Sequence, residues 1–124
     1  MVRQRISMTA LALVAASLVG TAAYAHPTLT SSNPQANAST SNYPTEIRLN
    51  FSEGVVAKLS GIDLKDESGK AIATGAAATD PKDSKQLIVP LTSPLAAGRY
   101  TVSWHVVSED THRVKGEYSF KVEH

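Results

Sequence analysis

Apolar and polar residues alternate along several stretches of the chain. Ile47, Leu49 and Phe51 are separated by polar residues, and the same two-residue period runs through residues 62–65, 98–107 and 114–123. A period of two places one set of side chains on the core face of a sheet and the other set in water. These stretches therefore predict β-strands.

Turn-forming residue pairs divide the chain after residue 25 at short intervals. The pairs are Asn33-Pro34, Tyr43-Pro44, Ser60-Gly61, Ser68-Gly69, Asp80-Pro81, Ser93-Pro94 and Ala97-Gly98. No segment in this region shows a sustained helical period. The alanine-rich residues 71–83 are interrupted by Gly75 and by a proline, so we expect a loop there. Short strands between regular turns predict an all-β fold, a Greek-key β-sandwich.

The first 25 residues have the layout of a secretory signal peptide. Arg3 and Arg5 precede an apolar run over residues 6–20, and Ala23-Tyr24-Ala25 supplies small residues at the positions that signal peptidase reads. The alternative is a retained membrane anchor, but a spanning helix needs about 20 mostly apolar residues, and residues 21–25 are small and polar. We expect cleavage after Ala25, which leaves residues 26–124 as a single exported domain.

The composition of residues 26–124 argues against several function classes. Loss of Arg3 and Arg5 lowers the basic residues from 12 to 10 against 11 acidic ones, so nucleic acid is a poor partner for this domain. No polybasic run suggests binding to a membrane surface. The chain has no cysteine, and both methionines, Met1 and Met8, lie in the removed segment. The mature domain therefore contains no sulfur ligand.

Cleavage after Ala25 would make His26 the N-terminal residue. Its α-amine and its ring Nδ1 can then close a six-membered chelate ring on a metal ion. Pro27 follows and has no amide proton, so a metal cannot continue along the backbone through deprotonated amides. The alternative is that His26 is there by chance, since signal peptidase tolerates most residues after the cut.

A second candidate is Asp110-Thr111-His112, in the short polar connection between the last two predicted strands. In an extended segment, residues two apart share one face. Asp110 and His112 can then share a metal ion, or Asp110 can orient the imidazole. The alternative is an ordinary charged hairpin turn. Together with His26, the set offers three nitrogens and one oxygen, a combination that suits Cu(II), whereas Cu(I) prefers sulfur.

Four segments of the chain resemble the CopC family of periplasmic copper-binding proteins. They are Phe51-Ser52-Glu53-Gly54, residues 94–104 (PLAAGRYTVSW), residues 107–112 (VSEDTH) and residues 116–122 (GEYSFKV). A mature start of His-Pro that leads into Ser31-Ser32-Asn33-Pro34 is similar as well. The resemblance extends over essentially all of residues 26–122.

This resemblance implies a seven-stranded, cupredoxin-like Greek-key sandwich that binds one Cu(II) ion in the periplasm. His26 would supply amine and imidazole, His112 the second imidazole and Asp110 a carboxylate contact, and Glu53 matches a family glutamate placed beside the site. Many members also have a Met-rich loop for Cu(I), but the corresponding residues 66–70 contain no methionine. We therefore expect a Cu(II)-only member that sequesters copper or delivers it to a CopD-type membrane importer.

Two other readings remain open. An N-terminal histidine paired with a second histidine also resembles the copper brace of polysaccharide monooxygenases, but a domain of this size offers little room for an open oxygen position and a broad polysaccharide face. A metal-free Ig-like interaction module is the other alternative. We expect a carrier and not an enzyme.

His105 is expected on the surface, His124 at a frayed end, and Trp104 in the core.

Overall fold

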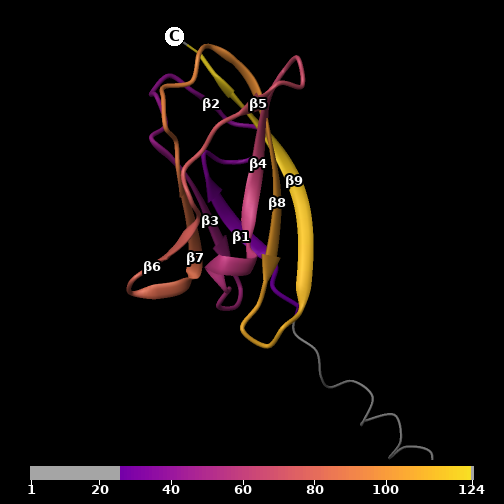
Figure 1. The fold of residues 1–124 in the computed structure, drawn as a ribbon. Helices are drawn as coiled ribbons and strands as arrows, with labels where there is room; N and C mark the ends of the chain where they lie inside the picture. Colours follow the sequence, from indigo (N-terminus) through magenta and orange to yellow (C-terminus); the bar gives the residue numbers. More distant parts are fainter. Residues whose placement is uncertain (1–25, 124) are drawn as a thin grey trace, which may run out of the picture.

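Two β-sheets pack face to face in residues 26–123, the part of the chain that this computed structural model describes (Figure 1). The strands are β1 (Leu29–Asn33), β2 (Ser39–Thr40), β3 (Glu46–Phe51), β4 (Gly61–Asp66), β5 (Ala71–Ile72), β6 (Ala78–Asp80), β7 (Asp83–Pro90), β8 (Gly98–Val107) and β9 (Arg113–Val122). One sheet has the order β1-β3-β7-β6 and the other the order β2-β9-β8-β4-β5. A 3₁₀ turn, η2 (Ala57–Leu59), precedes β4.

The predicted all-β sandwich is confirmed, and neighbours that are not consecutive in the chain occur in both sheets, as a Greek-key arrangement requires. The described residues form nine strands where seven were expected, because β2 and β5 are two-residue strands at sheet edges. The loop predicted over residues 71–83 is wrong in part, since β5, β6 and the start of β7 lie within it. Ala71 pairs with Lys65 and Ala78 with Ile88 through the backbone, and the hydrophobic pattern does not report such pairing.

The alternation in sequence becomes an alternation in burial. In β8, Tyr100, Val102, Trp104 and Val106 face the core, while His105 between them is exposed. The same parity holds in β3 and β9. The core is completed by Ile47, Leu49, Phe51, Val55, Leu64, Leu87, Val89, Leu95, Tyr118, Phe120 and Val122. The expected places of Trp104 in the core and His105 on the surface are confirmed.

Gly116 makes room for the largest core side chain. It pairs with Trp104 across β8 and β9, and a Cβ at Gly116 would lie 2.5 Å from Cζ2 of the indole. We expect Gly116→Val to destabilise the fold by about 2 kcal/mol, because overfilling a packed core forces side chains out of their preferred rotamers. Chemical denaturation measures this. Glu117→Val is the matched control, since it adds the same side chain at the exposed neighbouring position, and equal unfolding free energies for both variants would contradict the packing.

One end of the sandwich gathers three chain segments that are far apart in sequence. The β8–β9 turn and the first described residues lie at the same end, and the C-terminal end of β9 lies at the other (Figure 1). Thr28 and Ser52 exchange backbone and hydroxyl hydrogen bonds beyond the paired parts of β1 and β3. Val55 forms a bridge with Ser108 at the end of β8. The first 25 residues and His124, on which the signal peptide and a frayed end were predicted, lie outside the described residues.

Candidate metal centre

The β8–β9 connection is a tight turn from Ser108 to His112. The Ser108 N–H donates to the His112 carbonyl and the Thr111 N–H to the Ser108 carbonyl, each at 2.9 Å. Thr111 has φ of 72°, a left-handed conformation that is rare for a β-branched residue. The segment is therefore a turn, and the interpretation of residues 110–112 as an extended segment is wrong. Asp110 and His112 meet because the chain turns between them.

Asp110 holds the ring of His112. Nδ1 of His112 lies 3.1 Å from Oδ1 of Asp110. An ionised carboxylate can only accept hydrogen bonds, so this contact places the proton on Nδ1 and the lone pair on Nε2, the nitrogen that can then bind a metal. A hydrogen bond from Ser108 is the largest cause that lowers the pKa of Asp110 below its usual value, and the contact with His112 lowers it further. Asp110 is therefore held as a carboxylate.

His26 lies beside His112 although 85 positions separate them in sequence. The hydrogen bonds between Thr28 and Ser52 fix the approach of the N-terminal segment. The two ring centroids are 5.0 Å apart, with the rings inclined at 70°. Two nitrogens bound to one ion lie within about 4 Å of each other, because each metal–nitrogen bond is about 2 Å long. Rings this close can share an ion after small side-chain rotations.

Glu53 lies between the two segments that carry the histidines. The preceding residue, Ser52, bonds with Thr28, and the carbonyl of the following residue, Gly54, accepts a hydrogen bond from the Glu109 N–H at 3.0 Å. The Oε2 atom of Glu53 is buried and has no hydrogen-bond partner in the structure. A buried carboxylate oxygen without a donor is costly. Such an oxygen fits a site that a cation or a bound donor completes.

The structure places His26 next to His112 and His112 next to Asp110, and Glu53 lies in the segment that follows β3. Within residues 26–123, however, no three His, Asp or Glu side chains are grouped closely enough to hold a metal ion. The predicted ligand set counts the α-amine of His26, and in the 124-residue chain that nitrogen belongs to a peptide bond. Asp110 also faces Nδ1 of His112, on the opposite side of the ring from a metal bound at Nε2.

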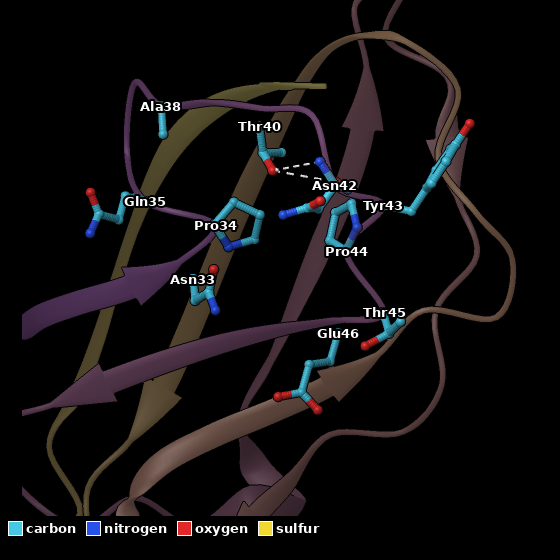
Figure 2. A pocket seen from close by; sticks show the side chains of 10 residues that line it. All are labelled: Asn33, Pro34, Gln35, Ala38, Thr40, Asn42, Tyr43, Pro44, Thr45 and Glu46. Atoms are coloured by element: carbon cyan, nitrogen blue, oxygen red, sulfur yellow. Dashed lines mark hydrogen bonds between the residues drawn. The ribbon is translucent and has the colours of Figure 1, made fainter. Parts of the chain in front are cut away.

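A hollow of about 460 Å³ lies elsewhere on the molecule, around β2 and the start of β3 (Figure 2). It is lined by Asn33, Pro34, Gln35, Ala38, Thr40, Asn42, Tyr43, Pro44, Thr45 and Glu46. It contains no histidine, and its one carboxylate, Glu46, is paired with Arg48 at 2.9 Å. Without a histidine, this hollow lacks the imidazole nitrogens of the predicted site, and the histidine pair remains the candidate site. No helix among residues 26–123 is long and apolar enough to cross a lipid bilayer.

Sequence reasoning assigned no role to Ser108. The residue belongs to the VSEDTH segment, but a serine after two valines at a strand end is equally typical of an ordinary turn. Its complete burial and its bonds to both Asp110 and His112 become visible only in the structure. The sole signal in the sequence was its place two residues before Asp110.

The fold and the site define a small β-sandwich protein with a histidine pair at one end. Residues 29–123 match the family described as the CopC domain. The chain belongs to the CopC family. It is 47% identical over 113 residues to Protein YobA of Escherichia coli, with 91% of each chain covered. It is 41% identical over 119 residues to Copper resistance protein C of Xanthomonas campestris pv. juglandis, with 92% of this chain and 93% of that one covered.

Two solved structures share this sandwich. CopC from Methylosinus trichosporium OB3b superposes with a TM-score of 0.74 at 31% identity, covering 79% of this chain and 94% of that one. PcoC from Escherichia coli, described as a methionine-rich copper resistance protein, has a TM-score of 0.72 at 39% identity, covering 80% of this chain and all of that one. In contrast to a methionine-rich protein, this chain has no methionine after residue 8.

Proposed function

We propose that residues 26–124, released by cleavage after Ala25, bind one Cu(II) ion in the periplasm and act as a copper carrier, not as an enzyme. The observation that carries the proposal is the approach of the His26 and His112 rings to 5.0 Å from opposite ends of the sequence. The names of the relatives, copper resistance proteins, point to the same metal.

The donor set selects the metal. Cleavage adds an α-amine to the two imidazoles, which gives three nitrogens, and the carboxylates of Asp110 and Glu53 offer oxygen. Nitrogen-rich, tetragonal sites suit Cu(II), and Cu(II) heads the affinity series of the divalent first-row metals. The mature domain has no sulfur ligand for Cu(I). Asp110 contributes either as a direct contact or by orienting His112, and the 3.1 Å contact with Nδ1 supports the orienting role.

Binding of a single ion is compatible with two physiological roles. A protein of this kind either sequesters Cu(II) in the periplasm or delivers it to a CopD-type importer in the inner membrane. We infer a carrier and not an enzyme because a domain of this size, with carboxylates near the site, offers little room for an open oxygen position and a broad polysaccharide face.

Titration of residues 26–124 with Cu(II) tests the proposal. We expect one equivalent to bind, with an electron paramagnetic resonance spectrum dominated by equatorial nitrogen ligands. In competition, Zn(II) should be displaced, since the affinity order favours copper. A spectrum equal to that of Cu(II) in buffer, or binding that Zn(II) suppresses at equal concentration, would refute the proposed site.

A further inference from the structure

Ser108 stands apart from the other polar residues of the sandwich. It is 0% exposed, and among residues 26–123 only Ser32 is another polar residue that counts as buried. A hydroxyl group costs free energy in an apolar environment unless it is hydrogen-bonded. The preceding residues, Val106 and Val107, are both buried, so the site of Ser108 is apolar on one side.

All hydrogen-bonding groups of Ser108 are directed into the turn that carries His112. The hydroxyl donates to Oδ1 of Asp110 and accepts the His112 N–H at 3.1 Å. The main-chain N–H donates to the His112 carbonyl, and the carbonyl accepts from the Thr111 N–H, each at 2.9 Å. One buried residue thus bonds to each of the three residues that shape the site side of the turn.

The two hydroxyl bonds differ in what they determine. The bond from the His112 N–H fixes the backbone from which the imidazole projects. The bond to Asp110 fixes the same carboxylate oxygen that faces Nδ1 of His112. A continuous chain therefore runs from the buried hydroxyl through the carboxylate to the ring. Because Val55 bridges to Ser108, these hydrogen bonds are also tied to the segment after β3 that carries Glu53.

We propose that Ser108 is a positioning residue for metal capture, which sets both the backbone and the ring orientation of His112 before the ion arrives. The proposal rests on the proposed function. Outer partners of metal ligands orient the ligand and fix its tautomer, and their loss typically lowers metal affinity by about 10- to 100-fold. Ser108 orients the imidazole indirectly, through its hydrogen bond to Asp110. It orients the backbone of His112 directly, through the hydrogen bond from the His112 N–H.

Ser108→Ala in residues 26–124 tests the proposal, and Ser60→Ala is the matched control. The Ser60 hydroxyl donates to the Val56 carbonyl at 2.7 Å and accepts the Val107 N–H at 3.1 Å. It therefore supports the backbone next to the turn through two hydrogen bonds of its own, with no contact to Asp110 or His112 among them. Both variants lose a hydroxyl that bonds the backbone, so a general loss of stability should affect both.

We expect Ser108→Ala to lower the Cu(II) affinity by about 10- to 100-fold, measured against a competing chelator, and to broaden the copper hyperfine lines as the ring orientation becomes heterogeneous. Ser60→Ala should keep the parent affinity and spectrum. Ser108→Thr retains the hydroxyl and should recover most of the affinity. In the metal-free protein, the His112 amide should exchange faster in Ser108→Ala than in the parent and in Ser60→Ala.

The outcomes separate the two proposals. Unchanged affinity, spectrum and amide exchange in Ser108→Ala would overturn the positioning role, and so would equal losses of affinity in Ser108→Ala and Ser60→Ala. If the parent binds no Cu(II), the proposed function fails, and the amide exchange of His112 still decides whether Ser108 orders the turn.

Discussion

His112→Ala should lower the Cu(II) affinity of residues 26–124 by more than about 100-fold, since removal of a direct ligand costs more than removal of an outer partner. The sandwich should remain folded, because His112 projects from a turn with 31% of its side chain exposed and is not a member of the core. Competition with a chelator measures the affinity, and thermal unfolding of the metal-free protein measures the fold.

His105→Ala is the matched control for this prediction. His105 lies on the same strand, β8, but on the exposed face, where it is the cross-strand partner of Gly61. Its loss removes an imidazole and should leave the copper affinity unchanged. Equal affinities for the parent and His112→Ala would eliminate His112 as a ligand, and a loss with His105→Ala would place copper on the outer face of the sheet.

Acetylation of the His26 α-amine should have a comparably large effect. The acetyl group converts the amine into an amide nitrogen, which destroys the six-membered chelate ring and leaves only the imidazole of His26. We expect the Cu(II) affinity to fall by more than about 100-fold, since a direct ligand is lost, and the equatorial nitrogen pattern of the resonance spectrum to change. The rest of the donor set is untouched.

The control carries the same acetyl group on Lys121, near the end of β9 that lies away from His112. This control should bind Cu(II) like unmodified residues 26–124. If the protein acetylated at its N-terminus binds as tightly as the control, His26 does not act through its α-amine, and copper binding does not require cleavage after Ala25.

The strands that the sequence predicts are those with one clearly apolar face. β3, β8 and β9 alternate over six to ten residues, and their apolar positions are the buried ones. The hydrophobic pattern does not predict β1, because only Ser32 of its five residues is buried. β7 shows just Leu87 and Val89 as buried residues in eight. These strands are held by backbone pairing with β3, and that partnership is a property of the folded chain.

The candidate site also has features that the sequence predicts and features that only the folded structure shows. His26, Asp110 and His112 could be proposed from residue type, spacing and family resemblance, because metal ligands belong to few residue types. Their proximity depends on Thr28 bonding with Ser52 and Val55 bridging to Ser108, and these long-range contacts leave no periodic pattern. The buried oxygen of Glu53 and the hydroxyl bonds of Ser108 are likewise consequences of packing.

The direction of β9 has a practical consequence. The strand begins at Arg113, directly after His112, and its ten residues carry the chain about 30 Å to the far end of the sandwich. A fluorophore, an affinity tag or a sensor surface attached after residue 124 therefore leaves the histidine pair facing solvent. Attachment at the other terminus would occupy the α-amine nitrogen of the proposed site. For experiments on copper exchange with a partner, the protein is therefore best immobilised through its C-terminus.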